Sequence, residues 1–356
     1  NVPAAVMGPA QDGTVSQVLA SSPLKPKYAT GVDNESAYEL LAQRVQADAE
    51  AAEAARAAEQ AAKEQAKADA AAQKALEKEI SHQIYQTYRS KTGLPHEIEQ
   101  NIEYLKRSNP EYEYHLFDDE DIKAFILEHY GEVIWGYYQR IAPAYGAARA
   151  DFFRYLLVYE CGGVYIDIKS SLDRPLKEVL RPEDKFILTH WDNLPGGQYE
   201  GIGIFPELKF LPRGEYIQWC IASVAGHPFL RAVILQMLRN IDEYTPFKHG
   251  AGLWGVLRTT GPVMYTKTIE AMRSTLVEGQ DYRLLDKPQD VGLRYSIYDT
   301  AGVYGHKKAL KANYNKAYTP IITTPDRPLY AKVAKGYLFT CLACRVLRDK
   351  LLARFK

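Results

Sequence analysis

Two charged residues, Asp167 and Lys169, stand at the end of the apolar stretch Val-Tyr-Ile-Asp-Ile, which reads as a buried strand. A carboxylate inside such a strand is costly unless it lies at the exposed end or has a cationic partner. Because side chains alternate along a strand, we expect Asp167 and Lys169 to point one way and Ile168 into the core. Ligands of open α/β sheets bind outside the carboxyl ends of strands, which is where Asp167 is expected.

A second charged pair precedes this strand. Asp151 and Arg154 are three residues apart in residues 145–160, where apolar side chains recur at helical spacing. An isolated acid–base pair of this kind is usually a structural ion pair. We therefore keep that interpretation open alongside a role in ligand binding. Gly162-Gly163 then ends the helix and turns the chain into the strand. Helix, turn and strand form one block that could bind a ligand.

The bulk composition limits the partners of the chain. It has 356 residues and a formal net charge of zero, so nothing electrostatic predicts a nucleic-acid partner. No apolar run reaches the roughly 18 residues that span a bilayer. The chain begins at Asn1, which leaves a signal peptide or anchor upstream open. Cys341 and Cys344 form a single C-x-x-C, which favours two packed cysteines over a zinc site.

The composition changes along the chain and predicts four segments. Residues 1–34 are rich in Pro, Gly, Ser and Ala, and we expect them to be disordered or a linker. Residues 35–78 are mostly Ala, Glu, Lys, Arg and Gln, which predicts a long helical stalk without a coiled-coil seam. Residues 79–328 predict a globular domain. Residues 329–356 predict a basic amphipathic helix that packs on the domain or contacts an anionic membrane surface.

Strand and helix patterns alternate at the start of the globular domain. Residues 82–88 predict a strand and residues 96–109 a helix; residues 112–117 predict a second strand and residues 118–130 a helix with an acidic start. This order predicts an α/β domain with a mainly parallel sheet.

A later loop is a second candidate for ligand contacts. Trp191, Asp192 and Asn193 follow the short apolar strand at residues 186–189. Loops after strands carry ligands in α/β folds, so we expect contacts with an acceptor or a sugar there. A plain turn is an equally good reading of the same residues.

The central block resembles the DxD-motif glycosyltransferases of the family-32 group. These include initiating mannosyltransferases of yeast outer chains, sphingolipid mannosyltransferases and bacterial capsule or lipopolysaccharide enzymes. The residues that fall on the family pattern are Ala147, Asp151, Arg154, Tyr155, Tyr159, Gly162, Gly163, Tyr165 and Asp167. Weaker landmarks are the strand from His82 with Leu94-Pro95, the segment Phe117 to Asp121, Gly226-His227-Pro228-Phe229 and Thr260-Gly261-Pro262. The resemblance covers about residues 80–320.

The resemblance implies a GT-A fold, in which a Rossmann-like, mostly parallel sheet flanked by helices binds a UDP- or GDP-sugar. It implies hexose transfer to a hydroxyl of a glycan, glycolipid or glycoprotein, with retention. An inactive homologue that binds donor and acts as an assembly partner is the alternative. The implied location is the Golgi lumen or membrane in a eukaryote, and otherwise the cytoplasm at the membrane. The implied nucleotide-sugar residues are Gln83, Tyr85, Asp151, Arg154, Tyr165, Asp167, Lys169 and His306, with Asp167 and Lys169 catalytic.

Lys169 departs from the family pattern, because it occupies the second Asp position of D-x-D. The family's carboxylates usually hold Mn²⁺ or Mg²⁺ on the donor diphosphate, and a protonated Lys cannot. Three readings stay open. A metal is held by Asp167 with another carboxylate such as Asp173; Lys169 replaces the metal and pairs with the diphosphate; or Lys169 and Asp167 neutralise each other and the protein is weak or inactive.

Overall fold

The structure, a computed structural model, describes residues 13–28, 37–298, 305–306, 310 and 319–323. The chain divides into two units, residues 1–67 and 68–356, and each is described by itself. The predicted helix at residues 329–356, together with Cys341 and Cys344, lies outside the described residues.

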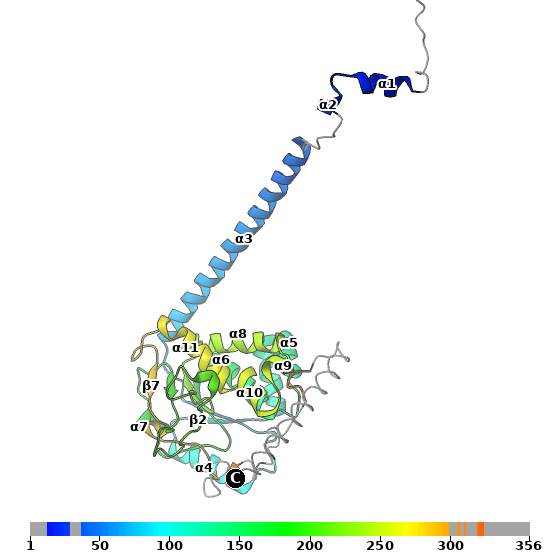
Figure 1. Ribbon diagram of the computed structural model, residues 1–356. Coiled ribbons are helices and arrows are strands. Elements are labelled where there is room, and N and C mark those ends of the chain that lie inside the picture. Colours follow the sequence, from blue (N-terminus) through cyan, green and yellow to red (C-terminus); the bar gives the residue numbers. More distant parts are fainter. Residues whose placement is uncertain (1–12, 29–36, 299–304, 307–309, 311–318, 324–356) are drawn as a thin grey trace, which may run out of the picture. The chain divides into compact units, whose positions relative to one another are not determined.

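The first unit is helical where it is described. Residues 13–28, predicted as linker, contain α1 (Thr14–Ser21) and α2 (Lys25–Tyr28), and α1 has no buried residue. The long helix is α3 (Ala37–Leu76), with 40 residues (Figure 1). Ala, Glu, Lys and Gln have high helix propensity, and the helix contains neither Gly nor Pro. Its last turns belong to the second unit, where Ala75 is buried beside Gly226.

A four-stranded sheet organises the second unit. Its strands are β1 (Gln83–Thr87), β2 (Glu113–Phe117), β3 (Gly163–Ile166) and β6 (Cys220–Ser223), in the order β2-β1-β3-β6. Both β2 and β3 run parallel to β1, and β6 is antiparallel to β3. Two short sheets pair β4 (Ser171–Leu172) with β8 (Leu293–Arg294) and β5 (Ile187–Thr189) with β7 (Arg283–Leu285). The predicted α/β fold with a mostly parallel sheet is confirmed.

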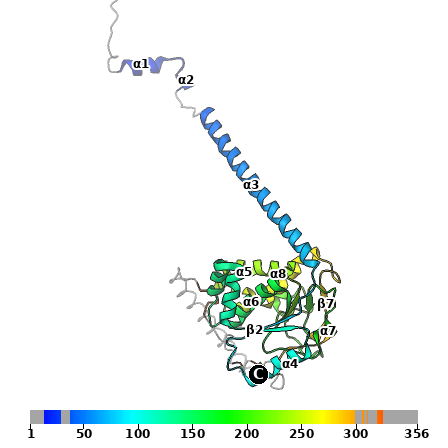
Figure 2. The ribbon, with the colours of Figure 1, turned by 180° about the vertical axis from the view of Figure 1, so that it is seen from behind.

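Helices cover the sheet, and Figures 1 and 2 both show α5, α6 and α8 together, away from α4. The helices are α4 (His96–Ser108), α5 (Asp119–Arg140), α6 (Gly146–Cys161), α7 (Leu176–Val179), α8 (Pro228–Asp242), α9 (Pro246–His249), α10 (Gly252–Thr259) and α11 (Pro262–Met272). The acidic start predicted for α5 is a capping box, in which Asp118 accepts from the backbone N–H groups of Glu120 and Asp121.

Strand periodicity divides the apolar core in two. Tyr85, Tyr165 and Ile221 join a core with α5, α6, α8 and α11. Their strand neighbours Ile84 and Val164 join a second core that includes residues of α4, α7 and β5. Because successive side chains of a strand point to opposite faces, the sheet is buried on both sides.

The Gly-Gly turn after α6 is tightly enclosed. Gly162 and Gly163 have φ of 67° and 94°, in the region that favours glycine. A Cβ on Gly162 would lie 2.8 Å from the backbone nitrogen of Ala225, and one on Gly163 would lie 2.9 Å from the carbonyl oxygen of Gln83. The turn therefore fits α6 and β3 against the neighbouring strands with no room for a side chain.

The strand after this turn is shorter than predicted. β3 ends at Ile166, and the backbone turns so that the N–H of Ser170 donates to the carbonyl of Asp167 at 2.8 Å. Asp167 thus directly follows the carboxyl end of β3. Ile168 was predicted in the core, and this is wrong, because the turn leaves it lining a cleft.

Candidate functional site

A cleft of about 860 Å³ opens at the carboxyl ends of β1 and β3. Its walls come from the first half of α6, the turn after β3, α10, and the loops that hold Trp191 and Trp219. This is the edge at which open α/β sheets bind ligands. The cleft therefore joins segments that are more than a hundred residues apart in the sequence.

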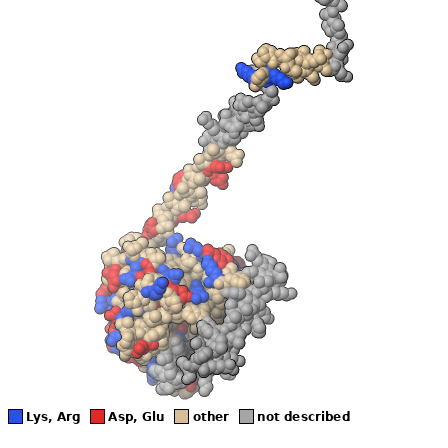
Figure 3. Space-filling view, viewed as in Figure 1, with Lys and Arg blue, Asp and Glu red and all other residues tan. Residues whose placement is uncertain are grey.

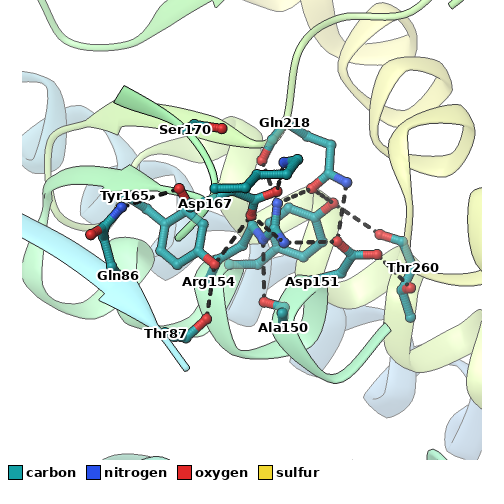
Figure 4. A network of polar contacts seen from close by, with 12 residues as sticks. Gln86, Thr87, Ala150, Asp151, Arg154, Tyr165, Asp167, Ser170, Gln218 and Thr260 are labelled. Atoms are coloured by element: carbon teal, nitrogen blue, oxygen red, sulfur yellow. Dashed lines mark hydrogen bonds and ion pairs between the residues drawn. The ribbon is translucent and has the colours of Figure 1, made fainter. Parts of the chain in front are cut away.

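Four charged residues form what we call the charge block: Asp151, Arg154, Asp167 and Lys169. The guanidinium of Arg154 lies 3.2 Å from Asp151 and 3.0 Å from Asp167. Its Nη1 donates to the carbonyl of Gln218 at 2.9 Å (Figure 4). Arg154 is only 3% exposed. Removing any one of these three side chains would leave an uncompensated charge in the site. Arg154 and the two carboxylates therefore stabilise one another as a unit.

Neutral side chains satisfy the rest of the Asp151 carboxylate. Gln218 donates to its Oδ1 at 3.0 Å, and Thr260 donates to its Oδ2 at 2.9 Å (Figure 4). Thr260 belongs to the Thr-Gly-Pro landmark at the start of α11, so that landmark reaches the charge block. Burial raises the pKa of Asp151, against the opposing effect of Arg154.

Asp167 and Lys169 form the more exposed half of the charge block. The Nζ of Lys169 lies 2.5 Å from the Oδ2 of Asp167, whose side chain is 22% exposed. Burial would raise the pKa of Asp167, but Arg154 and Lys169 outweigh it and hold that pKa below its usual range. Burial lowers the pKa of Lys169, and Asp167 opposes this effect. Asp167 is therefore an ionised carboxylate between two basic side chains.

Aromatic rings surround Lys169 on its other side. Its Nζ lies 4.6 Å from the ring centroid of Tyr295 and 5.8 Å from that of Trp219. The rings of Trp191, Trp219 and Tyr295 pack on one another with centroids 4.9 to 5.8 Å apart. We call these three residues the aromatic wall. Ring faces attract a cation, so the wall helps to hold Lys169 in the cleft.

A divalent metal does not fit the side chains present at Asp167. Its Oδ1 lies 3.0 Å from Arg154, and its Oδ2 is occupied by the Nζ of Lys169. Asp173, the carboxylate expected to complete a metal site with Asp167, does not line the cleft. Within the described part of the chain, no group of three His, Cys, Asp or Glu residues is arranged to hold a metal ion. A hard cation needs several oxygen ligands, whereas the oxygens of Asp167 are already bound by the guanidinium of Arg154 and the ammonium of Lys169.

Most of the predicted nucleotide-sugar residues meet at the cleft: Asp151, Arg154, Tyr165, Asp167, Lys169 and His306. Gln83 and Tyr85 do not. Gln83 starts β1 and contacts His115, and Tyr85 is buried in the core beside His115 and Phe117. Gln83 is the first residue of β1 and Tyr85 its middle residue, whereas Thr87 at the carboxyl end lines the cleft.

The loop after β5 contributes only one of its three predicted residues. Trp191 lines the cleft, but Asp192 and Asn193 do not. Asp192 accepts from the backbone N–H of Gln198 at 3.1 Å. Asn193 is buried and donates to the carbonyls of Ile202 and Arg213. These two side chains shape the loop, as the alternative reading of a plain turn expects.

Among the cleft residues that the sequence analysis did not identify, three lie close together in the chain: Glu215, Gln218 and Trp219. They stand in the segment Gly-Glu-Tyr-Ile-Gln-Trp-Cys, which leads into β6. Glu215 stands at the start of a mostly apolar stretch, as Asp167 stands just after one, and that signal could have identified it.

Two family models match parts of the chain. Residues 95–187 match the glycosyltransferase sugar-binding region containing a DXD motif, and this span includes the whole charge block. Residues 1–102 match the helicase HerA-like C-terminal region. That second span includes the whole Ala-rich helix α3, and it contains no G-x-x-x-x-G-K-[ST] phosphate-binding sequence.

Curated relatives agree with the first of these matches. An initiation-specific alpha-1,6-mannosyltransferase of Schizosaccharomyces pombe is 27% identical over 201 residues, which cover 52% of this chain and 47% of that protein. An inositol phosphoceramide mannosyltransferase 3 of the same organism is 28% identical over 165 residues, covering 46% and 38%. The chain spans about half the length of the curated relatives it matches.

A solved structure, the UDP-bound glycosyltransferase domain from the YGT toxin, is 9% identical, with a TM-score of 0.43 over 63% of this chain and 82% of that chain. This likeness is too low to support a conclusion. The sequence matches, by contrast, confirm the predicted resemblance: over the region that builds the charge block, the chain is similar to the family-32 glycosyltransferases.

Proposed function

We propose that this protein is a glycosyltransferase that moves a hexose from a nucleotide diphosphate sugar to a hydroxyl of a glycan, glycolipid or glycoprotein. The observation that carries the proposal is Lys169, held beside Asp167 in a cleft at the carboxyl ends of two parallel strands. The GT-A fold implied by the resemblance puts the donor at this edge. The curated relatives are named as mannosyltransferases, which makes mannose the first sugar to test.

Lys169 is the cation proposed to stabilise the leaving diphosphate. Arg154 is buried, and its nitrogens already bond to Asp151, Asp167, Gln218 and the carbonyl of Ala150. Lys169 is 9% exposed and lines the cleft, so its ammonium group can reach a phosphate oxygen. Donors that are already in place where negative charge develops lower the barrier without reorganisation.

The chemistry proposed is transfer with retention. The bond between the anomeric carbon and the diphosphate oxygen breaks, and the acceptor oxygen bonds to the same face of that carbon. The acceptor proton passes to the leaving diphosphate, so no side chain of the protein has to act as a base. Asp167 stays ionised throughout and keeps Lys169 charged and oriented.

Donor hydrolysis with and without EDTA tests this role. GDP-mannose and a panel of UDP- and GDP-hexoses serve as donors. We expect the wild type to keep its rate in EDTA and Lys169→Ala to lose about 10²–10³-fold in kcat. Lys169→Asp, which creates D-x-D, should regain activity only with Mn²⁺. Lys177→Ala is the matched control, since Lys177 is 59% exposed and lies outside the cleft. Loss of wild-type activity in EDTA would contradict the proposal.

A second candidate function is an inactive homologue that binds donor and serves as an assembly partner. The observation that favours it is the close pairing of Lys169 with Asp167, in which each charge neutralises the other. Binding of GDP or UDP without turnover of any donor would support this candidate over the enzyme.

Localisation follows the proposed activity. In a eukaryote we propose the Golgi as the site of action. No helix among the described residues combines the length and apolar character that crossing a membrane requires. Membrane contact through residues 329–356 stays a prediction, since that segment lies outside the described residues.

A further inference from the structure

Glu215 is a buried acid in the wall of the cleft, and the reaction proposed above does not use it. It is 6% exposed and lines the cleft together with Asp167 and Lys169. The indole N–H of Trp191 donates to its Oε1 at 2.7 Å. Its Oε2 is buried without a hydrogen-bond partner among the described residues. An unpartnered buried carboxyl oxygen is costly, so its retention calls for a ligand.

Two glycines make room for this side chain. Gly203 has φ of 79°, and a Cβ there would lie 2.7 Å from the Cγ of Glu215 and 2.8 Å from the ring of Trp191. The carbonyl of Gly203 accepts from the backbone N–H of Glu215 at 2.9 Å. Gly214 has φ of 64°, and a Cβ there would overlap the carbonyl oxygen of Gly203. The backbone around Glu215 is therefore shaped to hold a carboxyl group at this place.

Burial also sets the protonation of Glu215. It raises the pKa to about 8, and the hydrogen bond from Trp191 opposes this only partly. At neutral pH the carboxyl is therefore mostly neutral. A neutral carboxyl accepts through one oxygen and donates through the other, so Oε2 can give a proton to a hydrogen bond with a ligand oxygen.

A second unpartnered donor lies in the same wall. The indole Nε1 of Trp219 is buried without a partner among the described residues, and Trp219 lines the cleft. Its carbonyl accepts from the backbone N–H of Asp167 at 2.8 Å, which ties this wall to the charge block. Two neutral donors beside packed aromatic rings suit a ligand that has hydroxyl oxygens and apolar C–H faces, which describes a pyranose.

We propose that Glu215 is a specificity-determining residue that binds one hydroxyl of the transferred hexose, with the indole N–H of Trp219 as a second donor to the same sugar. This inference rests on the proposed function and names the part of the cleft that recognises the sugar rather than the nucleotide. Because the charge block is next to this wall, the hexose would lie beside Lys169 with its diphosphate on the Lys169 side.

The test compares nucleotide binding with sugar recognition in the full chain. Probes are GDP and UDP, GDP-mannose and UDP-glucose, and the monodeoxy forms of each hexose. Variants are Glu215→Leu, the isosteric Glu215→Gln and Trp219→Phe, with exposed Glu183→Gln as the matched control. Binding is measured by calorimetry, and donor hydrolysis gives kcat and KM.

We expect Glu215→Leu to bind the nucleoside diphosphate within about 2-fold of wild type and to lose about 10²-fold in kcat/KM for the hexose donor. For one monodeoxy donor, the kcat/KM values of wild type and Glu215→Leu should differ by less than about 3-fold. The missing hydroxyl and the missing carboxyl each remove the same contact. Glu215→Gln should recover most of the activity, because an amide also accepts and donates.

Two results would overturn the inference, and they differ in what else they overturn. If wild type turns over a nucleotide hexose and Glu215→Leu and Glu215→Gln match it on every donor, only the role of Glu215 fails. If wild type neither turns over nor binds any nucleotide hexose, the proposed function fails and the inference fails with it.

Discussion

The charge block and the aromatic wall face the same cleft but satisfy their polar groups differently. In the charge block, each carboxylate has a cationic or hydrogen-bonding partner within the protein. In the aromatic wall and its neighbour Glu215, a carboxyl oxygen and an indole N–H have no partner among the described residues. The polar groups of the charge block are thus paired within the protein, whereas Glu215 and Trp219 keep polar atoms that a ligand would satisfy. This difference separates charged side chains that are paired within the protein from polar side chains that have atoms available to bind a sugar.

Removing Arg154 should have the largest effect, since it breaks the charge block. Arg154→Met leaves the buried Asp151 and the partly exposed Asp167 without their shared cation. We expect unfolding free energy to fall by about 3–5 kcal/mol. Urea denaturation measures it, with exposed Arg231→Met as control. A loss of unfolding free energy below about 1 kcal/mol would mean that the charge block does not stabilise this part of the fold.

Gly163→Ala tests the turn that positions the block. A Cβ at φ of 94° would meet the carbonyl oxygen of Gln83 at 2.9 Å. We expect a loss of about 2–3 kcal/mol from strain and displacement of β3. Gly136→Ala is the control, because Gly136 lies in α5 with open space around its Cβ. Equal stabilities of the two variants would contradict this reading of the turn.

The pH dependence of stability sharpens the contrast at Glu215. Its pKa is about 8 in the folded protein against a usual 4.5, so the folded state holds the extra proton between these values. The contribution of Glu215 to the free energy of unfolding is therefore fully present below the unfolded pKa. It is lost as pH rises toward 8, by up to about 1.4 kcal/mol per pH unit. Glu215→Gln should remove that slope. Parallel stability curves for the two proteins from about pH 5 to 8 would show that Glu215 is ionised in the fold.

The smallest effect is expected for an ion pair outside the cleft. Arg140 contacts Asp242 at 2.6 Å, but the side chains are 29% and 50% exposed. Asp242→Asn should change unfolding free energy by less than about 1 kcal/mol, because solvent screens the pair. A loss as large as that of Arg154→Met would mean that burial does not explain the difference between the two pairs.

Local patterns predicted the elements of the block well. The helix predicted over residues 145–160 is α6 (Gly146–Cys161), and the Gly-Gly turn lies where two positive φ angles are needed. Residues 82–88 were predicted as a strand, and β1 lies there, but Gln83 and Tyr85, which the resemblance implied as nucleotide-sugar residues, do not line the cleft. The rule that placed Asp167, that ligands meet the carboxyl ends of strands, would have selected Thr87 instead.

The sequence by itself determined the order of strands and helices from β1 to β3, the Gly-Gly turn and the identity of the charge block, because these follow from residue spacing and backbone preference. Only the tertiary structure decided how the charges pair: Lys169 lies on Asp167, and Arg154 lies between two carboxylates. It also decided that Glu215 and Trp219 share the cleft with residues some fifty positions away in the sequence. Such pairings depend on long-range packing and on which atoms lose water, and no local pattern records either.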